Sequence, residues 1–215
     1  MSNNPILNFR KTPNEENRSE WYGKLLKRKN EVNYRVWISF LGHTPIATIN
    51  CIWAAIKRDS FIPDKVILIA TPSAEKVFEK YKEVLRCLLE YYNDHLDQNN
   101  YLGIIRVSER PTFSELQMRI KGAIDRYITA KDVSIAVDIT PGRKIMTVAS
   151  LSVALLRNVD RIYYLYLIDE KAYGEKLYSE IPCRHQILYQ IVGDELAGGK
   201  FVIELGCDKD VYSKR

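Results

Sequence analysis

The stretch VDITPGRKIM, residues 137–146, joins an apolar run to a proline, a glycine and two adjacent cations. The apolar run is typical of a buried strand. The pair Thr140-Pro141 is typical of a helix start, because threonine caps a free helical N–H and proline has its φ preset. The stretch therefore predicts a strand, a turn and a helix. Arg143 and Lys144 fall in the first helical turn, where the helix dipole disfavours cations, so the pair indicates an anionic ligand; the alternative is two solvated surface cations.

The same alternation of strand and helix runs through the chain from Tyr34 onward. Short β-branched or aromatic runs are separated by longer stretches whose apolar residues repeat at helical spacing. This pattern predicts an α/β domain with a doubly wound, Rossmann-like, mainly parallel sheet, helices on both faces and a C-terminal β-hairpin. The expected strands are 34–41, 65–70, 102–107, 133–138 and 161–167, the hairpin strands are 185–192 and 200–205, and the helices are 45–58, 73–97, 112–129 and 141–157.

With 215 residues and 46% hydrophobic content, the chain is long enough to bury one substantial core. Residues 1–33 carry seven Lys or Arg and four Glu, so we expect a polar N-terminal arm there. The alternative is a short amphipathic helix around Trp21, Leu25 and Leu26. Residues 34–215 are expected to form one domain that includes the hairpin.

Charge and apolar pattern set expectations for partners and location. The 32 Lys and Arg against 27 Asp and Glu give +5, which suits a small anionic ligand and is too weak to require long nucleic acid. Charges interrupt every apolar segment before the roughly 18–20 residues that a membrane-spanning helix needs, and the first residues lack a secretory signal pattern. We therefore expect a cytoplasmic protein without membrane contact. Packed, reduced thiols are favoured over disulfides or metal ligands, because no C-x-x-C pair occurs among Cys51, Cys87, Cys183 and Cys207.

Thr-Pro follows a predicted strand three times, at residues 44–45, 71–72 and 140–141. Ordinary helix initiation explains the pair at 71–72. The other two pairs matter because doubly wound sheets bind ligands where the crossovers of adjacent strands run in opposite directions. If the first and fourth strands flank that point, the sequences GHT at 42–44 and TPGRK at 140–144 face each other.

These two loops supply the candidate ligand-binding residues. Glycine lets the backbone approach a ligand closely, and free N–H groups at helix starts attract anions. Arg143 offers a planar fork for phosphate, and Lys144 offers a compact charge. Asp138 is expected to order the loop by accepting backbone N–H bonds, whereas Met146 and Val153 are expected to face the core. The candidate ligand-binding residues are Gly42, His43, Thr44, Thr140, Pro141, Gly142, Arg143 and Lys144.

The segment DITPGRKIM, residues 138–146, resembles the D-x-T-G-G-x-K-x-M element that follows the fourth strand in CRISPR-associated Rossmann-fold (CARF) proteins of type III CRISPR systems. The segment FLGHTP, residues 40–45, is similar to the short Gly and Ser/Thr loop after the first strand of that family. The resemblance covers about residues 34–192. Pro141 replaces the usual first glycine, which removes one N–H from the site. The resemblance implies a homodimer that binds a cyclic oligoadenylate, most often cyclic tetra-adenylate, across its two-fold axis.

Most CARF domains activate a fused effector, commonly an RNase with an R-x(4–6)-H pair. None of the three histidines has an arginine at that spacing, and the tail is short for an effector domain. The chain thus resembles the stand-alone ring nucleases, which bind the cyclic messenger and degrade it. This resemblance implies cleavage without a metal or other cofactor, in which a ribose 2′-hydroxyl attacks the neighbouring phosphate and leaves a 2′,3′-cyclic phosphate end.

For this reaction the expected catalytic residues are Lys144, Arg143 and Thr44. The two cations would stabilise the charge that develops on the phosphorane, and the Thr44 hydroxyl would position the ribose or the phosphate. His43 is a further candidate acid or base, although a histidine beside a turn more often has a structural role.

Four alternatives stay open. A non-catalytic sensor would bind the ring and act through a partner protein. A nicotinamide-dependent oxidoreductase would need G-x-G-x-x-G after the first strand and a ribose-binding acid after the second, and the sequence has neither. A DNA-binding regulator would need recognition helices, which the pattern does not offer. A metal hydrolase has the least support, because the histidine and cysteine spacing offers no ligand set.

Overall fold

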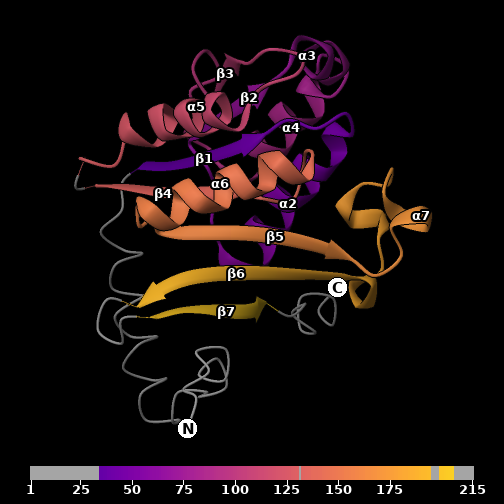
Figure 1. Ribbon diagram of the computed structural model, residues 1–215. Coiled ribbons are helices and arrows are strands. Elements are labelled where there is room, and N and C mark those ends of the chain that lie inside the picture. Colours follow the sequence, from indigo (N-terminus) through magenta and orange to yellow (C-terminus); the bar gives the residue numbers. More distant parts are fainter. Residues whose placement is uncertain (1–33, 131, 195–198, 206–215) are drawn as a thin grey trace, which may run out of the picture. The chain divides into compact units, whose positions relative to one another are not determined.

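The computed structural model describes residues 34–130, 132–194 and 199–205, so the predicted polar arm lies outside the described residues. A seven-stranded sheet forms the centre of the described chain (Figure 1). Its order is β3-β2-β1-β4-β5-β6-β7, in which the first five strands of the sequence run parallel and the last two pair antiparallel as the predicted hairpin. The strands are β1 (Tyr34–Phe40), β2 (Lys65–Ala70), β3 (Leu102–Arg106), β4 (Val133–Asp138), β5 (Arg161–Leu167), β6 (Gln186–Asp194) and β7 (Gly199–Leu205).

Helices connect the parallel strands and cover both faces of the sheet (Figure 1). This arrangement confirms the predicted α/β, doubly wound fold class, including the mainly parallel sheet and the closing hairpin. The helices are α2 (Pro45–Asp59), α3 (Pro72–Phe78), α4 (Lys82–Tyr92), α5 (Phe113–Asp125), α6 (Lys144–Leu156) and the single turn α7 (Glu170–Tyr173), with 3-10 turns η2 (Tyr178–Glu180) and η3 (Cys183–His185).

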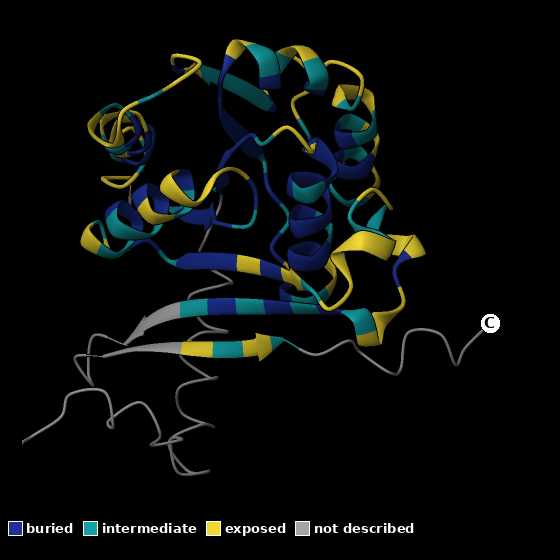
Figure 2. Cartoon of the chain, turned by 45° about the vertical axis from the view of Figure 1, so that its right-hand side comes forward, coloured by how far each residue is buried: buried dark blue, intermediate teal, exposed yellow. Residues whose placement is uncertain are grey.

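Alternation along the strands divides the core into two apolar layers. In β1, Trp37 packs in the layer with α2 and α4, whereas Val36 and Ile38 pack in the layer with α5 and α6. Because both faces of the central strands are covered, these strands form near-continuous apolar runs. In Figure 2 the first half of β5 is buried, and exposed positions appear towards its carboxyl end, where Tyr164 and Tyr166 lie on the surface.

The boundary between β1 and β4 is the place at which the winding of the sheet reverses. β1 lies between β2 and β4, with Ile38 paired to Ile67 on one side and to Val137 on the other. The connection through α2 leads outward to β2, and the connection through α6 leads outward to β5 on the opposite side. The predicted switch point between the first and fourth strands is therefore confirmed, and doubly wound sheets bind their ligands at such points.

The helix predicted over 73–97 is two helices, α3 and α4. The chain leaves α3 through a tight turn in which the Tyr81 N–H donates to the Phe78 carbonyl (2.7 Å). α4 ends at Tyr92 because Asn93 is extended and its side-chain amide donates to the Asp64 carboxylate (2.9 Å). The contact with Asp64 thus ends α4, although apolar residues continue at helical spacing beyond Tyr92.

A buried polar cluster ties α2 to β5. The Arg161 Nε donates to the Asp59 carboxylate (2.9 Å), and the Tyr163 hydroxyl donates to the same oxygen. The Tyr163 ring stacks on Trp37 with the ring centroids 5.4 Å apart. These contacts fix the first half of β5 against the centre of the sheet.

The cysteines only partly follow the prediction of packed, reduced thiols. Cys51 is buried and free, as expected. Cys87 is free but exposed, because it lies on the solvent side of α4, and Cys183 is disulfide-bonded in the turn η3 before β6. The prediction is therefore right about the reduced state of Cys87 but wrong about its packing, and it is wrong for Cys183; Cys207 lies outside the described residues.

Candidate functional site

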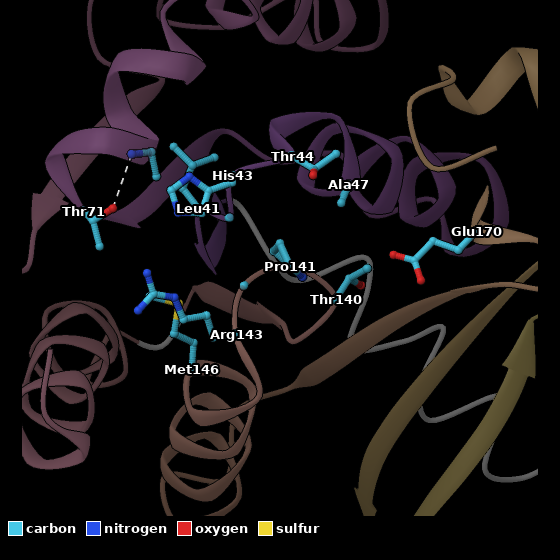
Figure 3. Close-up of a pocket in the computed structure, with 13 residues that line it drawn as sticks. Leu41, His43, Thr44, Ala47, Thr71, Thr140, Pro141, Arg143, Met146 and Glu170 are labelled. Carbon is cyan, nitrogen blue, oxygen red and sulfur yellow. Dashed lines mark hydrogen bonds between the residues drawn. The ribbon is translucent and has the colours of Figure 1, made fainter. Parts of the chain in front are cut away.

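A cavity of about 290 Å³ opens at the carboxyl ends of β1 and β4 (Figure 3). Its walls are the loops after β1, β2 and β4 together with the first residue of α7. Every candidate ligand-binding residue of the sequence lines this cavity except Lys144. The two loops that the sequence predicts to face each other, at 42–44 and 140–144, are therefore brought together.

The two loops touch through their glycines. A Cβ at Gly42 would lie 3.0 Å from the Gly142 nitrogen and 3.4 Å from its Cα. Gly42 was expected to let the backbone approach a ligand, but the close neighbour it meets is the facing loop. Gly142 has a φ of +96°, which favours glycine, and a Cβ there would lie 3.0 Å from the Met146 sulfur. Both glycines therefore shape the cavity by allowing close packing of the protein against itself.

The helix after β4 begins later than the sequence predicts. α6 starts at Lys144 rather than at 141, and Arg143 takes the N-cap position. The left-handed backbone at Gly142 makes a separate turn between the strand and the helix. The pair at 140–141 is consequently not a helix start, although its composition matches one.

Polar side chains beneath the cavity hold this turn in place. The buried Asp138 carboxylate accepts bonds from the Thr140 N–H (2.7 Å) and the Ser39 hydroxyl (3.1 Å). The Thr140 hydroxyl accepts the Leu165 N–H (2.8 Å) and donates to the Cys51 sulfur (3.3 Å). Burial raises the pKa of Asp138 to about 6, although the hydrogen bonds from Thr140 and its neighbours act to lower it. The predicted role of Asp138 in ordering the loop is confirmed.

The two adjacent cations have different positions. Arg143 lines the cavity, whereas the Lys144 side chain is exposed on α6 outside the lining. The Arg143 guanidinium forms no hydrogen bond or salt bridge with any residue of the described chain. Glu109 lies within electrostatic reach, since hydrogen bonds from Ser73 lower the pKa of this acid and the charges of His43 and Arg143 lower it further. Arg143 is therefore available to an anion in the cavity.

Both long helices that start at the cavity lack a side-chain cap. The Thr44 hydroxyl, before α2, accepts no bond from the first helical turn, and the guanidinium of Arg143, before α6, has no acceptor atom to offer. In contrast, Thr71 and Thr112 cap α3 and α5 with their hydroxyls. Thr71, which the sequence assigns to ordinary helix initiation, does cap its helix and also lines the cavity. The starts of α2 and α6 leave N–H donors and the positive ends of two helix dipoles for an anion.

Thr44 and His43 are both exposed and both line the cavity, where Figure 3 shows His43 beside Leu41 and Thr44 beside Ala47. Neither side chain is hydrogen-bonded to a residue within the described ranges. A hydroxyl and an imidazole are thus available for contacts with a ligand, or for proton transfer in the case of the imidazole.

Glu170 is a cavity residue that the sequence did not point to. It is the first residue of α7, two residues beyond the end of β5, and it lines the cavity. β5 is the neighbour of β4 in the sheet, so the rule that ligands bind at the carboxyl ends of central strands would have pointed to residues 168–170. The apolar pattern gave no such signal, because a one-turn helix has no periodicity to detect.

No group of three or more His, Cys, Asp or Glu side chains in the described chain is arranged to hold a metal ion. Within residues 34–130, 132–194 and 199–205, no helix has the length and apolar character needed to cross a membrane.

The chain matches no known family profile and no curated protein sequence. Its fold is similar to that of the Vibrio cholerae protein VC1899, with a TM-score of 0.48 and 9% identity over 66% of this chain and 34% of that chain. It is also similar to Csm6 of Enterococcus italicus, solved with cyclic hexa-2′-fluoro-hexa-dAMP, with a TM-score of 0.45 and 13% identity over 61% of this chain and 34% of that chain. The chain thus spans about a third of the length of each of these proteins.

Proposed function

We propose that the chain binds a cyclic oligoadenylate as a homodimer, with cyclic tetra-adenylate as the expected ring, and cleaves it without a metal to linear products with 2′,3′-cyclic phosphate ends. Such cleavage would switch off type III CRISPR signalling. The observation that carries the proposal is the cavity of about 290 Å³ at the switch point, where the guanidinium of Arg143 and two uncapped helix starts gather donors.

These donors suit a phosphodiester better than a neutral ligand. The N–H groups of Lys144 and Ile145 donate to no residue of the described chain, and the α6 dipole makes this end of the helix positive. The planar fork of Arg143 matches two oxygens of one phosphate. One phosphate held between Arg143 and the start of α6 is therefore the expected anchor of the ligand in each subunit.

An apolar stripe on α6 supports the homodimer. Ile145, Val148 and Leu156 are 40%, 55% and 82% exposed, and they recur at helical spacing along one face. Met118, on the adjacent α5, is 64% exposed. Several exposed apolar side chains grouped on one helix face are typical of an interaction site. The stripe begins two residues after Arg143, so two copies joined along it by a two-fold axis would place their cavities near each other, as a symmetric ring requires.

The proposed cleavage is a transesterification within the ligand. A ribose 2′ oxygen bonds to the neighbouring phosphorus and the P–O5′ bond breaks, while the 2′-hydroxyl loses a proton and the leaving 5′ oxygen gains one. Arg143 would stabilise the phosphorane from inside the cavity and Lys144 from its rim. Thr44 would hold the ribose or the phosphate through its hydroxyl, and His43 is the candidate for the proton transfers.

Incubation of the protein with labelled cyclic tetra-adenylate in the presence of EDTA tests this proposal. We expect linear product with a 2′,3′-cyclic phosphate end, in molar excess over protein, with mass spectrometry identifying the end group. Lys144→Ala and Arg143→Ala should each lower turnover. A ring that is neither bound nor cleaved would contradict the proposal as a whole.

The alternative is a non-catalytic sensor that binds the same ring and acts through a partner protein. The observation that favours it is the position of Lys144, which does not line the cavity, so that Arg143 is the one Lys or Arg lining it among the described residues. A stable complex from which intact ring is recovered after long incubation would support the sensor over the nuclease.

A further inference from the structure

The cavity carries a negative side chain as well as a positive one. Arg143 and Glu170 both line it, and Figure 3 shows them on opposite sides of Pro141, with the Glu170 carboxylate directed towards Thr140. A carboxylate accepts hydrogen bonds and donates none, and it repels phosphate. A site for phosphate alone would gain nothing from Glu170, so the ligand must present a hydrogen-bond donor to this wall.

The local structure holds Glu170 in place. The Asp169 side chain caps α7 by accepting the Ala172 N–H (3.0 Å), and the Gly174 N–H closes the turn on the Glu170 carbonyl (2.7 Å). A Cβ at Gly174 would lie 2.7 Å from the Glu170 carbonyl oxygen and 3.4 Å from its Cγ. The turn is therefore closed tightly around Glu170, which sets the direction in which its side chain leaves the backbone.

The Glu170 carboxylate forms no salt bridge or hydrogen bond with any residue of the described chain. Two other acids near strand ends are paired: the half-buried Glu75 binds Arg106 (2.7 Å), and the exposed Glu109 accepts the Ser73 N–H (2.7 Å). Glu170 differs from them because it faces the cavity instead of a cation or a helix start. The carboxylate oxygens of Glu170 are therefore available to accept hydrogen bonds from a ligand.

An oligoadenylate offers two kinds of donor, the ribose hydroxyl and the adenine amine. The ribose is bonded directly to the phosphate, whereas the amine lies at the far edge of the base. If a phosphate of the ligand lies at Arg143, the hydroxyl of the attached ribose is the nearer of the two donors, and it can reach Glu170 within the same cavity. Acidic side chains at the strand ends of doubly wound sheets accept bonds from ribose hydroxyls in the same way.

We infer that Glu170 accepts a hydrogen bond from a ribose 2′-hydroxyl of the ligand and thereby makes the site selective for ribonucleotides over deoxyribonucleotides. This inference rests on the proposed function, because it takes a phosphate of the oligoadenylate to lie at Arg143. Glu170 is a specificity-determining residue in this arrangement. Removing its carboxylate should reduce the preference for the ribose ring more than it changes binding of the deoxyribose ring.

The test is a set of rapid-mixing binding measurements, completed before turnover, with cyclic tetra-adenylate and with its all-deoxy counterpart, and chromatography confirms that the ring is intact at the time of each reading. The wild-type chain should bind the ribose ring about tenfold more tightly, or more, since a hydrogen bond to a charged group contributes at least that factor. In Glu170→Ala the ratio should fall to about threefold or less. Glu175→Gln is the matched control, because Glu175 is exposed just beyond α7 and does not line the cavity.

The outcomes separate this inference from the proposed function. If the wild-type chain binds neither ring, the proposed function fails and the inference falls with it. If both rings bind and Glu170→Ala keeps the full ratio, only the inference is overturned. A carboxylate that merely repels phosphate would give tighter binding of both rings in Glu170→Ala at an unchanged ratio, which also overturns the inference.

Discussion

Gly42 and Gly142 meet where β1 and β4 end, and a Cβ on Gly42 would stand 3.0 Å from the Gly142 nitrogen. The loop after β1 and the loop after β4 are therefore in backbone contact, with no side chain between them. This contact sets how far apart Thr44 and Arg143 stand across the cavity. It also explains why each loop carries a glycine at its closest point.

Gly42→Ala should force the two loops apart. Because the atoms that the new methyl group meets are backbone atoms, we expect a loss of about 1–2 kcal/mol in the free energy of unfolding and at least a tenfold loss of affinity for cyclic tetra-adenylate. Gly122→Ala is the control, since a Cβ there meets nothing within 4 Å and α5 should gain about 0.5–1 kcal/mol. Denaturant titration measures the stability, and rapid-mixing binding measurements completed before turnover give the affinity. Equal behaviour of the two variants would show that the glycine contact does not shape the cavity.

Arg143→Ala should weaken ring binding by about ten- to a hundredfold, because a charge-assisted bond contributes about 1.5–3 kcal/mol. Arg143→Lys should restore only part of this loss, since lysine keeps the charge but lacks the fork. The salt dependence of the dissociation constant should also become weaker in Arg143→Ala. Arg119→Ala, an exposed change on α5, is the control. Unchanged affinity in Arg143→Ala would place the phosphate elsewhere.

The central strands β2 and β4 were predictable because both of their faces are buried. Residues 65–70 and 133–138 form strands with the predicted bounds, since a strand covered on both faces is apolar along its length. Residues 161–167 also form the predicted strand, although Tyr164 and Tyr166 are exposed. Helix ends were harder to predict. The break between α3 and α4 and the end of α4 at Asn93 depend on a turn bond and on a contact with Asp64. The spacing of apolar residues in the sequence indicates neither the turn bond nor the contact with Asp64.

In the candidate site, too, the features set by strand order were predictable from the sequence, whereas those set by contacts in the folded chain were not. Loops 42–44 and 140–143 were predictable, because strand order and helix connections place them at one switch point. The orientation of Lys144 away from the lining was not predictable, because the Gly142 turn moves the helix start by three residues. Glu170 was missed because the β5–α7 connection brings it to the cavity only in the folded chain.

Asp138 should give the fold a specific dependence on pH. Its pKa in the folded chain is about 6, raised by burial above its ordinary value of 3.8. Its protonated form is therefore favoured by folding, so the stability it contributes is complete below about pH 4 and is lost as pH rises through about 6. The free energy of unfolding of the wild type relative to Asp138→Asn should fall by up to about 3 kcal/mol over this interval. Parallel stability curves for the two proteins, measured by urea titration, would contradict the raised pKa.

The apolar stripe of α6 should hold the dimer. The double variant Val148→Asp, Leu156→Asp places two charges on this stripe. Val148 is 55% and Leu156 is 82% exposed in the single chain, so the fold should tolerate both changes. A packed interface should not tolerate them, because each charge would be buried without a partner. We expect the wild type to sediment as a dimer and the double variant as a monomer, with ring affinity reduced at least tenfold because each ring would then contact one cavity. Tyr91→Asp is the control, since Tyr91 is 77% exposed on α4 and lies away from the stripe. A double variant that stays dimeric and binds the ring normally would show that the two cavities meet through another face.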